Sequence, residues 1–248
     1  MEYYYFIIFI IFGLLPSLVW LFYYLKKDLH PESKLMIVKV FFYGIIVTVP
    51  VFFIQIWLSQ LLTQVQSLEF FVDYPVVVDI LKWFFVIALT EEALKYMVLK
   101  FAVLKNGELD EPLDIMLYMV IIALGFAGLE NILYLLSPVN NLSFDTILKT
   151  TIIISFVRFI GATFLHTLCS ALLGYFLALS FLKNKQRIPL TIFGITLATL
   201  LHGLYNFSII TLEKPMNFII PIIIITGLGM FIIYVFDEIK KLKSICKI

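Results

Sequence analysis

Runs of about 20 consecutive apolar residues recur along this chain, and each is long enough to cross a bilayer as a helix. Polar stretches separate seven such runs. They lie near residues 3–25, 36–58, 80–103, 113–136, 159–182, 190–211 and 216–236. A segment in lipid must satisfy its backbone hydrogen bonds internally, which excludes open sheets. We therefore predict an all-α, polytopic transmembrane helix bundle of about seven spans.

The composition agrees with a protein of the membrane. Hydrophobic residues make up 62% of the 248 residues and charged residues only 14%, against roughly 45–50% and about 25% in soluble domains. The lipid bilayer is the expected surrounding, in the cell membrane. A net charge of +1 without a basic cluster gives no reason to expect nucleic acid as a partner. Two cysteines, Cys169 and Cys246, cannot form a disulfide framework.

Charge placement predicts an orientation, because Lys and Arg concentrate on the cytoplasmic side of membrane proteins. With the N-terminus outside, 13 of the 18 basic residues fall inside, and an odd number of spans puts the C-terminus in the cytoplasm. The inner set is Lys26, Lys27, Lys34, Lys39, Lys100, Lys105, Lys183, Lys185, Arg187, Lys240, Lys241, Lys243 and Lys247. No repeat or linker divides the chain, so we expect one domain over residues 1–248, with its motifs in residues 80–211.

Residues 144–158 do not fit this scheme simply. Joined to the following span they would make a helix of nearly 40 residues, about 60 Å long at 1.5 Å per residue. This length exceeds the bilayer, so we interpret the segment as interfacial or tilted.

Several polar side chains lie inside the predicted spans, where an ionisable group costs several kcal/mol and normally faces the bundle interior or water. They are Glu91, Glu92 and Lys95 in the third span, Glu130 and Asn131 in the fourth, His166 in the fifth, and His202 and Asn206 in the sixth. Counting along each helix puts one group from each of the four spans about 10–14 Å below the outer boundary. A shared layer of this kind predicts one functional site.

Each residue also has a structural interpretation. Glu91 and Lys95 are four residues apart and could form an ion pair within one helix. A single histidine in a bundle is often a hydrogen-bonded core residue, and Cys169 is best explained as a small buried hydrophobe. The common depth of the set favours a site over independent structural roles.

Carboxylates combined with imidazoles indicate hydrolysis. A buried glutamate can act as base and then as acid on a water, and His or Asn donors can stabilise an oxyanion. Alternatively, the cofactor could be a divalent metal such as zinc, for which the candidate ligands are Glu91, Glu130, His166 and His202. An ion- or proton-coupled transporter is the competing class, because intramembrane Glu, Lys and His also form proton relays.

Four motifs in order then resemble the PrsW family of membrane proteases. "EEALK" fits E-E-x-x-K, and "LGFAGLENILYLL" in the fourth span resembles the family's signature. "RFIGATFLHTLCSALLGYF" supplies an Arg, His and Gly-Tyr pattern, and "HGLYN" fits H-x-x-Y-N. Together these motifs cover about residues 90–206.

The resemblance implies an intramembrane endopeptidase that cleaves membrane-anchored substrates, such as single-span anti-sigma factors, near the extracytoplasmic face. It implies Glu91 as the water-activating base and Glu92 as a second essential carboxylate. His166 and His202 would be catalytic or oxyanion-stabilising, with Asn206 in support. The related CAAX-type endopeptidases, which act on lipidated peptides, use E-E-x-x-x-R and F-x-x-x-H; here Tyr96 and Glu130 replace the Arg and the His.

Three structural expectations follow from the sequence. Lys95 should be ion-paired, with Glu91 as the nearest candidate. Glu91 and the two histidines should approach closely enough to share one water, and Asn206 should line the same cavity. Water should reach this cavity from outside or laterally, with the connection from Ser137 to Thr150 as a possible gate.

Overall fold

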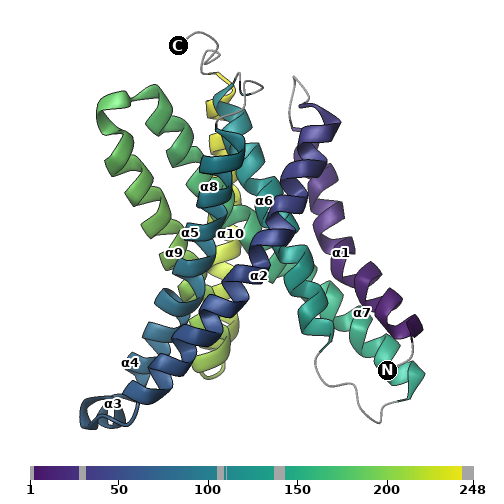
Figure 1. Ribbon diagram of the computed structural model, residues 1–248, viewed down its shortest axis with the longest axis vertical. Coiled ribbons are helices and arrows are strands. Elements are labelled where there is room, and N and C mark those ends of the chain that lie inside the picture. The colour runs from purple at the N-terminus through teal and green to yellow at the C-terminus, as the bar shows by residue number, and fades with distance from the viewer. Residues whose placement is uncertain (1–2, 28–31, 105–108, 110, 137–142, 242–248) are drawn as a thin grey trace.

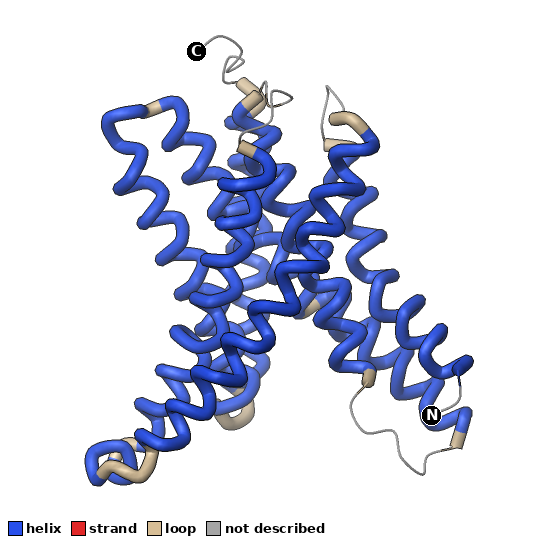
Figure 2. Tube along the Cα trace, viewed as in Figure 1, coloured by secondary structure: helices blue, strands red, loops and turns tan. Residues whose placement is uncertain are grey.

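The computed structural model describes residues 3–27, 32–104, 109, 111–136 and 143–241. Throughout these residues the regular structure is helical and contains no strand (Figure 2), which confirms the predicted all-α class. The long helices are α1 Tyr3–Leu25, α2 Lys34–Val65, α6 Pro112–Leu135, α7 Phe144–Ile160, α8 Ala162–Leu182, α9 Arg187–Thr211 and α10 Met216–Ile239. Within the described part, six helical stretches are long and apolar enough to cross a membrane, with α7 and α8 joined as one of them.

The third predicted span is a continuous helical run from Pro75 to Val103 that changes its winding. It consists of α4 Pro75–Ile80, the π-helical η1 Leu81–Leu89, α5 Thr90–Val98 and the π-helical η2 Leu99–Val103. The short helix α3 Glu69–Asp73 precedes it, and the 3₁₀ turn η3 Asn184–Gln186 joins α8 to α9. π-Helical turns occur often at functional sites, and here they flank the helix that carries Glu91, Glu92 and Lys95.

The segment of uncertain placement, residues 144–158, forms most of α7. This helix ends at Gly161, where the backbone leaves helical geometry (φ −92°, ψ −96°) and α8 begins. The break shortens the otherwise nearly 40-residue helix, and α7 packs beside α1, with the Ser155 hydroxyl donating to the Phe12 carbonyl at 2.6 Å. Whether α7 lies at the membrane interface stays a prediction.

The start of α1 and the end of α10 lie at opposite ends of the bundle (Figure 1). The end of α1, the turn between α8 and α9 and the end of α10 share the upper end in this view. These segments carry Lys26, Lys27, Lys183, Lys185, Lys240 and Lys241 of the set that the sequence assigns to the cytoplasmic side. The arrangement suits an odd number of crossings, and the count of seven and the orientation stay predictions.

Helix α6 is the axis of the bundle, buried along nearly its whole length and packed against α1, α2 and α8. Its approach to α2 depends on two glycines. A Cβ on Gly44 would lie 2.2 Å from the Ile122 carbonyl oxygen, and one on Gly125 would lie 2.0 Å from the Phe41 carbonyl oxygen. Small residues let membrane helices approach closely, and this contact places α6 against the site helices.

Replacing either glycine of this crossing should destabilise the bundle. In Gly125→Ala the added methyl group meets a backbone oxygen, which cannot move without shifting a helix, so we expect a loss of about 1–3 kcal/mol or more. Unfolding in detergent, followed by circular dichroism, measures the change. Gly227→Ala is the matched control, since a Cβ there has no neighbour within 4 Å; equal stability of the two variants would contradict the proposed crossing.

Candidate active site

Polar side chains from four segments meet inside the bundle. Glu91, Glu92 and Lys95 project from α5, Glu130 from α6, His166 from α8 and His202 from α9. All except Glu130 are buried, and Glu130 is partly exposed. Their mutual contacts show that the groups of the four predicted spans meet in one cluster, and their common depth in the membrane stays a prediction.

Lys95 is the central cation of this cluster. Its ammonium donates to Glu92 Oε1 at 2.9 Å and lies 3.7 Å from Glu91 Oε2. The expected ion pairing is therefore confirmed, but the closer partner is Glu92, three residues away, and not Glu91. The ammonium also lies 4.4 Å from the centre of the Phe126 ring, a cation–π contact.

The two histidines are held by carboxylates in the same way. His202 Nδ1 lies 2.9 Å from Glu92 Oε1, and His166 Nε2 lies 2.9 Å from Glu130 Oε2. An ionised carboxylate only accepts hydrogen bonds, so each of these ring nitrogens donates. In the neutral rings, the other nitrogen of each histidine then carries a lone pair. Lys95 Nζ, which only donates, lies 3.0 Å from His166 Nδ1 and agrees with this tautomer.

These two ring nitrogens lie beside the same carboxylate oxygen. His166 Nδ1 and His202 Nε2 each lie 3.9 Å from Glu91 Oε2. The other oxygen of Glu91, Oε1, accepts a hydrogen bond from Gln55 Nε2 at 3.0 Å, whereas Oε2 accepts none from any described residue although it is buried. The centre of the site thus brings three acceptor atoms together beside the Lys95 ammonium, and such a group of acceptors suits a cation.

The balance of charges in this cluster also favours a bound cation. The carboxylates of Glu91, Glu92 and Glu130 face the cations of Lys95 and Arg158. With neutral histidines, this set of described residues carries one uncompensated negative charge. Burying such a charge is expensive unless a partner is present.

Glu130 is tied to a second network. Arg158 Nη2 donates to Glu130 Oε2 at 2.7 Å, and Arg158 Nε donates to the Asn131 side-chain oxygen at 2.5 Å. Asn131 Nδ2 in turn donates to Gly13 O and Thr163 Oγ1. Because Asn131 ties α1, α6, α7 and α8 together, its role in the structure is to hold helices beside the site.

The predicted residues are thus mostly brought together. Three of them, Glu91, His166 and His202, each offer a ligand atom within 4.8 Å of one another and could hold a metal ion. Glu130, the fourth predicted ligand, is not in this group, and its Oε2 accepts from both Arg158 and His166. Asn206 is half-buried one turn beyond His202, and its place in a shared cavity stays a prediction.

The sequence reasoning missed Gln55. It stands in "VFFIQIWL", where it is the sole polar residue of an apolar stretch, and this isolation was the available signal. Arg158 appeared in a family motif, but its pairing with Glu130 could not be read from the spacing.

Comparison with known proteins finds similarity to one family of membrane proteases. The sequence model described as PrsW family intramembrane metalloprotease matches residues 32–236. A relative called protease PrsW from Bacillus subtilis is 28% identical over 215 residues, covering 86% of this chain and 87% of its own. Another of that name, from Geobacillus kaustophilus, is 30% identical and covers 82% of this chain and 80% of its own. No solved structure matches significantly.

Breaking the central ion pair should be costly. In Lys95→Met, Glu92 loses its cation inside the bundle, and removing one partner of a buried pair costs about 3–5 kcal/mol. The double variant Lys95→Met with Glu92→Gln should recover part of this loss, because the second change removes the charge that Glu92 would otherwise keep without its cation. A double-mutant cycle of unfolding free energies in detergent measures the coupling; strictly additive effects would show that the pair does not stabilise the fold.

Proposed function

The chain belongs to the PrsW family of intramembrane metalloproteases, and from this premise we propose that Glu91, His166 and His202 form its catalytic centre and hold a divalent metal such as zinc. The supporting observation is the convergence of three acceptor atoms, one each from α5, α8 and α9, of which Glu91 Oε2 has no hydrogen-bond donor among the described residues. His and Glu are ordinary zinc ligands. The protein is a multi-pass membrane peptidase, so a hydrolytic centre must operate within its helices.

The hydrogen bonds that the two proposed histidine ligands make to carboxylates also suit a metal site. Metal-binding histidines usually donate their other ring nitrogen to a carboxylate, which fixes the ring and its tautomer. Glu92 does this for His202 and Glu130 does it for His166. When bound, a metal ion supplies Lewis-acid chemistry, making a bound water more acidic and polarising a carbonyl.

The remaining residues position these groups and prepare the site for negative charge. Gln55 fixes the Glu91 carboxylate through Oε1, which directs Oε2 toward the histidines. The Lys95 ammonium, 3.7 Å from Glu91 Oε2, stands where it can stabilise the oxyanion that forms when a peptide carbonyl is attacked. Glu92, the second carboxylate of the motif, holds both Lys95 and His202 in place. Asn206 would be an additional donor on the His202 side.

The protease acts on membrane proteins within the bilayer, and we propose that its substrate is a single-span, anti-sigma-factor-like protein cleaved near the extracytoplasmic face. The whole chain is proposed to form one peptidase domain, since α2 contributes Gln55 and α1 contributes the Gly13 carbonyl to the network around the site. The comparisons favour a protease over the transporter that the same residues would also allow.

Loss of a proposed ligand should abolish both metal content and cleavage. In Glu91→Gln and in His202→Ala we expect at least about a hundredfold loss of activity, because second-shell changes alone cost 10–100-fold. Metal content by mass spectrometry of purified protein and cleavage of a reporter with one membrane span measure the two effects. Glu213→Gln is the control, because Glu213 is exposed in the α9–α10 connection.

Chelation of the wild-type protein should abolish cleavage, and adding zinc should restore it. Full activity of metal-free protein would reject the metal centre. It would instead identify Glu91 Oε2, the carboxylate oxygen without a hydrogen-bond donor among the described residues, as the base that activates water directly.

Access of water to the site can be tested from each side of the membrane. In a variant without Cys169 and Cys246, we expect Gln55→Cys and Asn206→Cys to react with an impermeant thiol reagent added from outside. Leu182→Cys, at the last residue of α8 and far from His166 near its start, should react solely from the cytoplasmic side. Exclusive labelling of the site positions from the cytoplasm would contradict the proposed orientation and cleavage side.

A further inference from the structure

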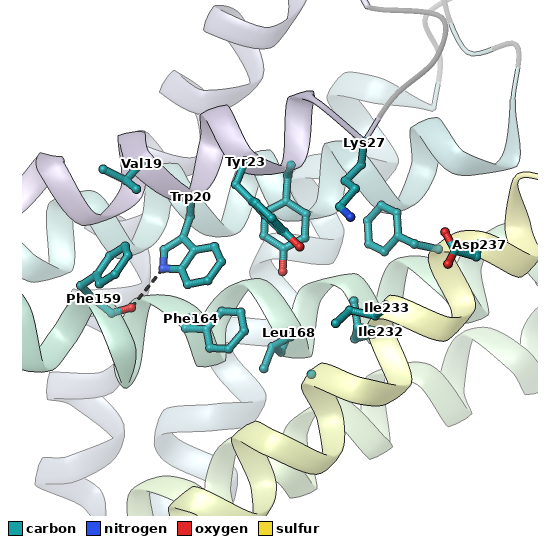
Figure 3. A pocket seen from close by; sticks show the side chains of 13 residues that line it. Val19, Trp20, Tyr23, Lys27, Phe159, Phe164, Leu168, Ile232, Ile233 and Asp237 are labelled. Carbon is teal, nitrogen blue, oxygen red and sulfur yellow. Dashed lines mark hydrogen bonds between the residues drawn. The ribbon is translucent and has the colours of Figure 1, made fainter.

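A cavity separate from the proposed catalytic centre lies between α1, α8, α10 and the end of α7 (Figure 3). Its volume is about 370 Å³, within the range of small-molecule sites, which are concave and mostly apolar with a few polar groups. Aromatic and aliphatic side chains form its walls, among them Trp20, Tyr23, Phe164, Leu168 and Ile232.

Ring stacking and hydrogen bonds hold the side chains of the cavity wall in place. Trp20 stacks on Phe164 with ring centres 4.2 Å apart and planes 6° apart, and its indole nitrogen donates to the Phe159 carbonyl at 3.0 Å (Figure 3). On the α1 side, the Tyr24 hydroxyl lies 3.2 Å from Thr167 Oγ1. These contacts satisfy the polar atoms of Trp20 and Tyr24, so these two rings present mainly apolar surface to the cavity.

The two charged side chains of the cavity lie near the ends of their helices. Lys27 follows the last residue of α1, and Asp237 lies near the end of α10. Both line the cavity, and no ion pair joins these two described residues. Trp20 is seven residues before Lys27, so the apolar part extends about 10 Å along α1 from this charged mouth. The mouth is therefore at the level of the helix ends, where lipid headgroups lie.

We propose that this cavity binds one zwitterionic phospholipid with its acyl chains against the aromatic walls. The phosphate would face Lys27 and a primary ammonium would face Asp237, so phosphatidylethanolamine has the complementary chemistry. Cationic side chains at the mouths of pockets between membrane helices bind lipid phosphates. An anionic phospholipid offers no cation to Asp237, and a charge-free apolar molecule uses neither group.

Binding here would steady the segment beside the site. Phe159 follows Arg158, and Phe164 precedes His166 by two residues, on either side of the break at Gly161. An occupant packed on Phe159 and Phe164 therefore stabilises the bend at Gly161, which positions Arg158 and His166. The lipid proposal does not depend on the metal assignment.

The test fills the cavity without disturbing the core. A Cβ on Gly229 would meet only Phe164 Cζ, at 3.9 Å, so Gly229→Leu should fold while its side chain occupies the cavity. Gly227→Leu is the matched control, two residues away on α10 with open space at its Cβ. Native mass spectrometry then measures binding of added phosphatidylethanolamine and phosphatidylglycerol to the full chain in detergent.

Wild-type protein and Gly227→Leu should bind phosphatidylethanolamine in preference to phosphatidylglycerol. In Gly229→Leu the affinity should fall about tenfold, the effect of excluding roughly two methylene groups from apolar contact. Asp237→Asn, a change at an exposed side chain that cannot unfold the bundle, should remove the preference for phosphatidylethanolamine. Equal binding to wild type and Gly229→Leu, or an unchanged preference in Asp237→Asn, would overturn the proposal.

Discussion

The pairing of charges inside an apolar bundle is the constraint on which the rest of the structure depends. Lys95 has no exposed surface and could not remain charged there without Glu92 at 2.9 Å and Glu91 at 3.7 Å. Glu92 also accepts from His202 on α9, and His166 on α8 contacts Lys95. Since a buried charge that loses its partner costs about 3–5 kcal/mol, these bonds determine which faces of α5, α8 and α9 must meet.

Close helix approach makes this pairing possible. Gly44 and Gly125 bring α2 against α6, with no room for a side chain at either residue, and the contact places Gln55 on α2 within reach of Glu91. The π-helical turns on both sides of α5 alter the rotation of the residues between them. Asn131 and Arg158 complete the frame by joining Glu130 to the neighbouring helices.

The same pairing leaves the site with three carboxylates and two cations. Two carboxylates and two cations satisfy one another and orient the histidines, and the third carboxylate, Glu91, keeps one oxygen without a donor among the described residues. Hydrolysis within a membrane needs such a polar centre, because the surrounding side chains offer neither water nor charge. The proposed lipid cavity differs from this centre: its walls are mainly apolar, and its two charged side chains, Lys27 and Asp237, lie at its mouth.

The sequence by itself determined the membrane class, the helical fold, the set of ionisable residues and the family, because apolar run length and the cost of charge in lipid act locally along the chain. The break at Gly161, the π-helical turns beside α5 and the contact of Gln55 with Glu91 were decided by tertiary structure. Helical spacing favoured Glu91 as the partner of Lys95, yet both glutamates are within reach of one flexible lysine. In the structure Glu92 is the closer partner, and the same carboxylate oxygen also binds His202, 110 residues away in sequence, a contact that helical spacing could not reveal.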